Sequence, residues 1–218
     1  MNVLRILIAD DHEVARKGIR ALLENHPGWE VCAEAKDGRE AVEFADRLRP
    51  DVLLLDIGMP NLNGLDAARQ ILATNPDARI LILTVHDTEQ IVREVLAAGA
   101  RGFLLKSDAG RDLVAAVEAL QRRRTFFTSK VAEMLLEGYL RPHSDSDDPT
   151  GQRVLTPRER EVIQLVAEGK TTKEVASVLS LSVKTAETHR TNLMRKLDLH
   201  SVADLTLYAV RNGIVQIY

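Results

Sequence analysis

Three carboxylates follow two apolar runs of the chain, where they could bind a charged ligand together. Asp10 and Asp11 come directly after the run at residues 3–9, and Asp56 ends the run at residues 52–56. Ligands of a parallel α/β sheet collect outside the carboxyl ends of its strands, so we expect these acids to face one crevice. Clustered carboxylates raise each other's pKa, and a hard divalent cation relieves this repulsion by binding several of their oxygens. The sequence therefore predicts a site for Mg²⁺.

A hydroxyl and an ammonium group follow two further apolar runs. The run at residues 80–83 ends at Thr84, and the run at residues 102–105 ends at Lys106. A metal ion, a lysine and a hydroxyl can neutralise the equatorial oxygens of a phosphoryl group, while a carboxylate attacks phosphorus as the nucleophile. These polar groups together predict phosphoryl chemistry.

Each of these residues alone would have a simpler explanation. A pair of aspartates often caps a helix, a lysine at a strand end is commonly solvated, and a threonine in a strand commonly packs. The ordered set is more specific, because it ends four of five predicted strands. That order is what favours a phosphoryl site.

The segments between these runs have the period of helices that cover a sheet. Strands that alternate with such helices form βαβ units. We therefore expect an α/β domain with a five-stranded parallel sheet and five helices on its two faces. The apolar helix faces are formed by Ala41, Phe44, Ala45 and Leu48, by Leu65, Ala68 and Leu72, and by Leu113, Val117 and Leu120.

The first 122 residues resemble the receiver domain of two-component response regulators, on the motifs just described. The resemblance implies the strand order 2-1-3-4-5. It also implies that Asp56 is the phospho-acceptor. The other implied roles are Mg²⁺ binding by Asp10, Asp11, Asp56 and the Gly58 carbonyl, a switch hydroxyl at Thr84, and a phosphoryl contact at Lys106.

The loop after the acceptor and the fifth strand add to this resemblance. Met59-Pro60 and Asn63-Gly64 match the loop that follows the acceptor in receivers. Phe103 stands where many receivers carry a tyrosine that turns inward on activation. Since Phe103 has no hydroxyl, we expect a switch at this position to depend on the packing of its ring.

Composition indicates more than one globular domain and no membrane segment. The chain has 218 residues, of which 45% are hydrophobic and 28% are charged. Its apolar runs are far shorter than the roughly 20 residues that span a bilayer, and no signal peptide opens the sequence. The single cysteine, Cys32, fits a reducing compartment. These features predict a cytoplasmic protein without membrane insertion.

The sequence pattern changes after residue 122, where we place the end of the first domain. Three arginines at 122–124, which suit a solvated helix end better than a nucleic-acid patch, precede a helical stretch near residues 129–140. Residues 142–151 hold two prolines, three aspartates and no apolar residue, so they form a linker. The predicted organisation is a receiver at residues 1–122, a linker at 123–150 and a second domain at 151–218.

Positive charge is concentrated in the C-terminal part of the chain. Residues 150–218 contain ten Lys and Arg against seven Asp and Glu, whereas residues 1–140 contain 18 against 22. A basic domain attached to an acidic one suggests a polyanion as the ligand of the basic domain.

Capping residues divide this C-terminal part into short helices. Thr156 and Thr171 each precede a glutamate by three positions, which is the capping-box pattern, and Gly169 ends the helix between them. Ser182 and Ser201 are positioned to cap two further helices. The second and third helices are joined by about three residues, as in a helix-turn-helix whose later helix lies in the DNA major groove.

The third of these helices has one apolar and one polar face. Its predicted inward stripe contains Val183, Ala186, Leu193 and Leu197. An isolated helix of this kind would have an ordinary solvated outer face, but its position after a capped helix and a turn favours DNA binding. The predicted base-contacting residues are Lys184, Thr185 and Thr188, and the predicted phosphate-contacting residues are His189, Arg190, Arg195 and Lys196.

Residues 155–201 resemble the LuxR-type DNA-binding domain through the segments LTPREREV, KEVA and SVKTAETHR. Together with the receiver, this makes nearly the whole chain similar to the NarL/FixJ subfamily of response regulators. The resemblance implies a small all-α four-helix helix-turn-helix domain whose final helix mediates dimerisation. The dimerisation residues that it suggests are Leu205, Tyr208 and Ala209.

The hypothesis from the sequence is a transcriptional regulator that is switched by phosphorylation. A sensor histidine kinase transfers phosphate to Asp56, and the modified protein binds promoter DNA as a homodimer. The protein would not be an enzyme, apart from slow loss of its own phosphate. Two alternatives stay open, a receiver-like regulator that is never phosphorylated and a Mg²⁺-dependent phosphohydrolase of the haloacid-dehalogenase kind. Phosphohydrolases of that kind have a second aspartate two residues after the nucleophile, a spacing that Asp10 and Asp11 do not provide.

Overall fold

The computed structural model describes residues 3–128, 131, 133–134 and 155–215. These residues form two compact units, one within residues 1–141 and the other within residues 142–218. The helix predicted near residues 129–140 and the predicted linker lie mostly outside the described residues. No helix in the described part of the chain is both long enough and apolar enough to cross a membrane.

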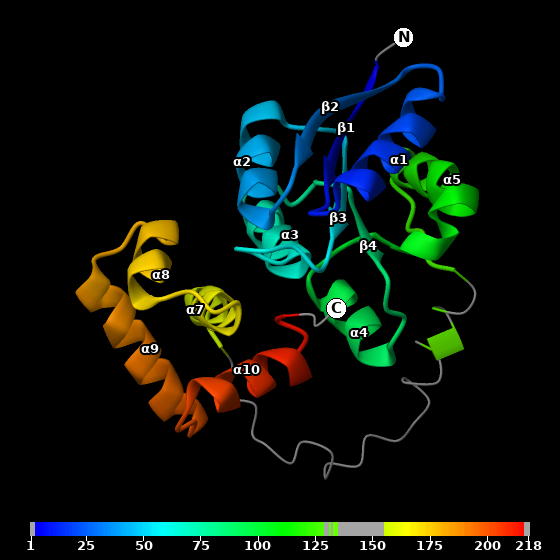
Figure 1. The fold of residues 1–218 in the computed structure, drawn as a ribbon. Helices are drawn as coiled ribbons and strands as arrows, with labels where there is room; N and C mark the ends of the chain where they lie inside the picture. Colours follow the sequence, from blue (N-terminus) through cyan, green and yellow to red (C-terminus); the bar gives the residue numbers. More distant parts are fainter. Residues whose placement is uncertain (1–2, 129–130, 132, 135–154, 216–218) are drawn as a thin grey trace. The chain divides into compact units, whose positions relative to one another are not determined.

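The first unit contains the predicted parallel sheet, with the order β2-β1-β3-β4-β5 (Figure 1). Every neighbouring pair of strands is parallel, so the carboxyl ends of the strands meet at one edge. The expected strand order is therefore confirmed. The strands are β1 (Leu4–Ala9), β2 (Trp29–Ala35), β3 (Val52–Asp56), β4 (Ile80–Thr84) and β5 (Gly102–Leu105).

Helices cover both faces of this sheet because the buried residues of the strands alternate between two cores. Along β1, Ile6 and Ile8 pack with α1 and α5, whereas Leu7 and Ala9 pack with α2, α3 and α4. Figure 1 shows α1 and α5 on one side of the sheet and α2 and α3 on the other. The helices are α1 (Glu13–Glu24), α2 (Gly38–Leu48), α3 (Gly64–Thr74), α4 (Glu89–Ala97) and α5 (Ala109–Gln121).

The chain after α5 continues to pack on the first unit. The amide of Phe103 donates to the carbonyl of Phe126 at 3.0 Å, and the amide of Phe126 donates to the carbonyl of Arg101 at 3.0 Å. Phe127 and Val131 pack against the core that includes Phe103. The first unit therefore includes residues after 122, because Phe126 is bonded along β5 and Phe127 packs on the core.

The described residues of the second unit form helices joined by short turns, with no strand among them. Its core joins Val162 and Leu165 of the first helix to Leu193 and Leu205 of later helices. Capping boxes are present at Thr156 and Thr171, as the sequence predicts, and the Ser182 hydroxyl accepts from the amide of Thr185 at 3.1 Å. The helices are α7 (Pro157–Ala167), α8 (Thr172–Val178), α9 (Val183–Leu197) and α10 (Val202–Arg211).

The predicted faces of α9 and α10 need two corrections. Val183 is 46% exposed, because it is the first residue of α9 and lies beyond the core that buries Ala186 and Leu193. Leu205 and Ala209, for which the sequence predicts a role in dimerisation, are fully buried in the core of their own unit and do not lie on its surface.

The cap of α8 leads to a stability prediction. The Thr171 hydroxyl accepts from the amide of Glu174, whose carboxylate accepts from the amide of Thr171 at 2.8 Å. Thr171→Ala removes the hydroxyl and is expected to cost about 1 kcal/mol of stability. Hydrogen exchange of the α7–α10 amides would measure this loss. Thr172→Ala, one position later, should have a smaller effect, and equal losses in the two variants would contradict the role of the cap.

Candidate functional site

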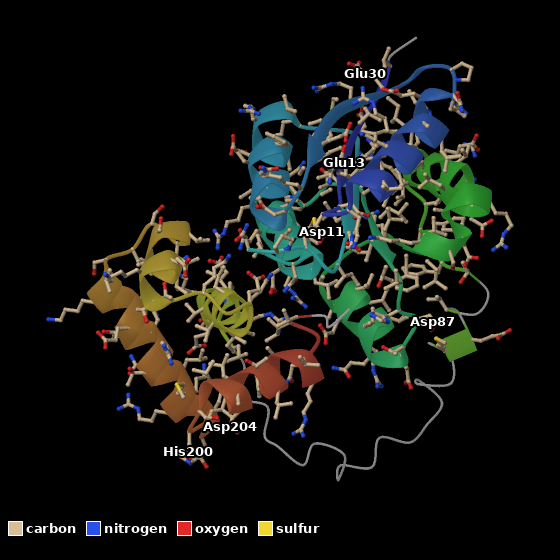
Figure 2. The ribbon with its side chains drawn as sticks, in the orientation of Figure 1. Asp11, Glu13, Glu30, Asp87, His200 and Asp204 are labelled. Carbon is tan, nitrogen blue, oxygen red and sulfur yellow. The ribbon has the colours of Figure 1, made fainter. Side chains whose placement is uncertain are left out.

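The predicted chemical groups of the first unit meet at the carboxyl edge of the sheet. Asp10 and Asp11 follow β1, Asp56 ends β3 and Thr84 ends β4, while Lys106 follows β5. Figure 2 shows Asp11 well apart from Glu30, which lies at the start of β2. The sheet therefore brings together side chains that are up to about one hundred residues apart in sequence, as its parallel order requires.

Lys106 connects two of the carboxylates. Its Nζ lies 2.7 Å from Oδ2 of Asp10 and 3.0 Å from Oδ2 of Asp56. Asp10 and Asp56 are buried, and Asp11 is partly exposed at the rim. One ammonium thus faces three carboxylates, which leaves the site with an excess of negative charge.

Burial and charge act in opposite directions on these groups. Burial raises the pKa of Asp56 to about 6, with help from Asp10 and Asp11, even though Lys106 acts to lower it. Burial lowers the pKa of Lys106, but its contacts with Asp56 and Asp10 outweigh burial, so its pKa is raised. The lysine therefore stays charged, while the acids retain unbalanced repulsion.

A divalent cation fits this set of donors. Ligand atoms of Asp10, Asp11, His12 and Asp56 all lie within 4.8 Å of one another. Among the described residues, Oδ2 of Asp10 and Oδ2 of Asp56 are buried and lack a hydrogen-bond donor other than the ammonium that they contact. Carboxylate oxygens in this state suit a hard cation that carries two positive charges.

His12 is a member of this cluster that was not predicted from the sequence. Its Nδ1 lies 2.7 Å from Oδ1 of Asp11, and its backbone amide donates to Oδ1 of Asp10 at 2.9 Å. The signal for this residue was its position directly after the two aspartates. Its amide helps to orient the carboxylate of Asp10 within the site.

Thr84 is buried at this edge, and Phe103 is buried within β5. The Thr84 hydroxyl accepts a hydrogen bond from the amide of His86 at 3.1 Å, which ties it to the loop before α4. The Phe103 ring is fully buried in the core shared with α2, α3 and α4. Its inward position agrees with a role in packing, and its backbone is bonded to Phe126.

A glycine allows the acceptor to lie close to α3. A Cβ at Gly64 would collide with the carbonyl oxygen of Asp56, so only glycine fits where α3 begins. The Gly64 amide donates to the carbonyl of Ile57 at 3.0 Å. These contacts fix the backbone on the carboxyl side of Asp56, and Gly58 lies in the loop that they close.

The predicted DNA surface of the second unit lies along α9. Lys184, Thr185, Thr188 and Arg195 are exposed, and His189 and Arg190 are half-buried. The Lys196 ammonium differs from the other cations, because it lies 2.7 Å from Oε2 of Glu159 on α7. Its charge is already matched within the unit, whereas no ion pair is formed by Lys184 or Arg190 with other described residues.

Family comparisons assign both units. Residues 6–118 match the response regulator receiver domain, and residues 153–209 match the bacterial regulatory proteins of the luxR family. The chain is a response regulator of the NarL/FixJ subfamily. The alternative of a phosphohydrolase is therefore not supported, since this family consists of DNA-binding regulators.

Similar proteins match this response regulator over almost their whole length. The transcriptional regulatory protein LiaR of Bacillus subtilis is 38% identical over 213 residues, covering 98% of this chain and 100% of LiaR. The nitrate/nitrite response regulator protein NarP of Escherichia coli is 39% identical over 210 residues, covering 96% of each chain.

Solved structures of full-length regulators are also similar. The RcsB response regulator of Salmonella typhimurium matches with a TM-score of 0.59 and 31% identity, covering 95% of this chain and 98% of RcsB. A complex of RcsB with DNA matches with a TM-score of 0.58 and 30% identity, over the same shares of the two chains.

The raised pKa of Asp56 predicts how the stability of this response regulator depends on pH without metal. The folded state holds the Asp56 proton more tightly than the unfolded chain does. The resulting cost to stability is absent below the ordinary pKa of 3.8, grows as the pH rises toward about 6, and is complete above it. Asp56→Asn should therefore raise the thermal midpoint of the first unit at neutral pH in EDTA.

This gain should shrink as the pH falls through about 6, where wild-type Asp56 becomes protonated. Trp29 is the only tryptophan of the chain and lies in β2, so its fluorescence reports unfolding of the first unit. If the variant were less stable than wild type at neutral pH, the ion pair with Lys106 would outweigh the repulsion among the acids.

Proposed function

We propose that this protein is a transcriptional regulator whose promoter binding is switched by phosphorylation of Asp56. The observation that carries the proposal is the cluster of Asp10, Asp56 and Lys106, with Thr84 on the next strand. In the proposed reaction an Asp56 oxygen bonds to phosphorus as the bond from phosphorus to the histidine nitrogen of a sensor kinase breaks. The protein acts in the cytoplasm, where kinase and promoter meet.

The residues present would hold Mg²⁺ through the carboxylates of Asp10, Asp11 and Asp56 and the carbonyl of Gly58. When bound, Mg²⁺ would neutralise charge on the phosphoryl oxygens and orient them. Lys106 would then contact a phosphoryl oxygen. The site supports one phosphorylation per molecule and slow loss of the phosphate, which distinguishes it from an enzyme that turns over substrate.

The switch that we propose follows from contacts that exist only in the phosphorylated state. The Thr84 hydroxyl would leave the amide of His86 to donate to the phosphoryl group, and the loop before α4 would move with it. The phosphoryl group can favour this arrangement only because the unmodified protein lacks that contact. Because Phe103 has no hydroxyl, any part that it plays in the switch would depend on how its buried ring packs.

Phosphorylation would act on promoter binding through pairing of the C-terminal units. Leu205 and Ala209 are part of the core, so the large apolar residues of α10 that a second copy would reach are Val202 and Leu207, which are 41% and 54% exposed. Tyr208 is partly buried at the edge of the core. A dimer would place two copies of α9 on half-sites about one helical turn of DNA apart, roughly 10 base pairs.

Footprinting of genomic DNA fragments tests both DNA binding and its dependence on phosphorylation. The protein would be compared with and without a small phosphodonor in the presence of Mg²⁺, at one stated salt concentration, because affinity depends steeply on ionic strength. We expect protection of paired half-sites that appears or strengthens on phosphorylation. Equal protection in both states would support a regulator that is never switched by phosphate, and no protection would reject DNA binding.

A further inference from the structure

The loop that follows the acceptor, residues 57–63, is bonded to the start of α2 through Asp37. This nearly buried carboxylate precedes α2, and its Oδ1 accepts from the amides of Arg39 and Glu40, each at 2.9 Å. Its Oδ2 accepts from the side-chain amide of Asn61 at 2.8 Å. One side chain therefore both caps α2 and holds the acceptor loop.

The backbone of the loop also lies directly against α2. The amide of Gly38 donates to the carbonyl of Leu62 at 3.1 Å, and a Cβ at Gly38 would collide with that carbonyl oxygen. Leu62 is buried beneath this contact. The far end of the loop is thus fixed to an element that contributes no chemical group to the site.

Asn61 adopts a backbone conformation that requires such support. Its φ is +64°, in the left-handed region that costs most residues of the order of 1 kcal/mol and that asparagine tolerates better than most. The hydrogen bond from its side chain to Asp37 holds it in this conformation. A residue kept in a sparsely populated region, in the loop that follows the acceptor, suggests that the shape of this loop matters for the site.

Gly58 lies between the two fixed ends of this loop. On the acceptor side, the amides of Met59 and Gly64 both donate to the carbonyl of Ile57, at 2.9 and 3.0 Å. On the other side, Asn61 and Leu62 are bonded to the start of α2. The position of the Gly58 carbonyl is therefore set from both ends.

We infer that Asp37 is a positioning residue for the metal site: through Asn61 it fixes the loop that offers the Gly58 carbonyl to the cation. The inference rests on the proposed role of Gly58 in Mg²⁺ binding. Mg²⁺ demands near-ideal octahedral geometry, so a displaced carbonyl is a poor ligand. Asp37 acts from outside the ligand set, as the supporting residues of metal sites do.

Magnesium titrations of the full chain test this role. Binding would be followed by the ¹⁵N–¹H NMR shifts of loop amides at constant ionic strength. Asn61→Gly keeps the positive φ but removes the side-chain amide, and Asp37→Ser keeps a helix cap but is too short to reach Asn61. We expect each variant to bind Mg²⁺ about tenfold more weakly than wild type, within the range for loss of a supporting residue.

A reciprocal exchange separates the hydrogen bond from the charge of Asp37. In the double variant Asp37→Asn with Asn61→Asp, donor and acceptor change places, the cap oxygen of α2 is retained and the net charge is that of wild type. We expect its Mg²⁺ affinity to return close to the wild-type value. The unfolding of each variant in EDTA, followed by Trp29, shows whether the first unit stays folded.

Two results would overturn the inference. One is wild-type Mg²⁺ affinity in either single variant, because a shared hydrogen bond is lost in both. The other is an exchange variant that is folded but binds as weakly as the single variants. If the wild-type protein itself shows no response to Mg²⁺, the proposed function falls along with the inference, which distinguishes that failure from the failure of Asp37 alone.

Discussion

Asp56→Asn is expected to reduce labelling by a small phosphodonor to background in the presence of Mg²⁺. The amide that replaces the carboxylate has no anionic oxygen to bond to phosphorus, while Asp10, Asp11 and Lys106 remain in place. In the structure Asp56 is the carboxylate that ends the central strand β3 and contacts the lysine from a buried position. Acetyl phosphate with intact-protein mass spectrometry would measure the labelled fraction.

The matched control is the same Asp→Asn substitution at an aspartate outside the site. Asp46 lies on α2, is largely exposed and pairs with Arg49, so Asp46→Asn should label like wild type. Residual labelling of the Asp56 variant would be mapped by peptide analysis, and phosphate found on Asp10 or Asp11 would reassign the acceptor. Repeated turnover of a phosphate ester by wild type would instead favour the phosphohydrolase alternative.

The site of the first unit was predictable because its functional side chains lie at the ends of strands. The apolar runs fixed where β1, β3, β4 and β5 stop, and a parallel sheet forces those ends to meet. The ends of the apolar runs therefore placed Asp56, Thr84 and Lys106 without any knowledge of loop shape.

The supporting contacts of the site were not predictable in the same way. The bond between Asp37 and Asn61 depends on a left-handed residue in a loop, and loop conformation leaves no periodic signal. The attachment of Phe126 to β5 likewise depends on how the chain turns after α5. Such contacts join segments that are distant in sequence, and no sequence pattern indicates that these segments lie close together in the fold.

The second unit shows the limit of helix periodicity. Caps at Thr156, Thr171 and Ser182 were confirmed because each depends on residues three positions apart. The apolar face of α10 was also visible in the sequence, but periodicity does not reveal what covers a face. In a unit this small, Leu205 and Ala209 are part of the core.

Lys184→Ala is expected to weaken binding to a specific promoter site by about 1–3 kcal/mol, whereas Arg190→Ala is expected to weaken binding to all DNA alike. Lys184 is exposed at the start of α9, where it can reach base edges in the major groove. Arg190 lies six residues further along the helix, where it can contact phosphate. Its loss should reduce the slope of log affinity against log salt by about 1. Titrations of the phosphorylated protein with specific and scrambled duplexes at several salt concentrations measure both effects.

Lys196→Ala is the matched control for these two variants, since it removes the same charge from the same helix. Its ammonium is already paired with Glu159, which in turn accepts from the amide of Thr156 in the cap of α7. We therefore expect a smaller change of salt slope than for Arg190→Ala, with a loss of stability in place of a loss of affinity. A slope change equal to that of Arg190→Ala would mean that Lys196 leaves Glu159 when DNA binds, and the phosphate-contacting role predicted for Lys196 would then stand.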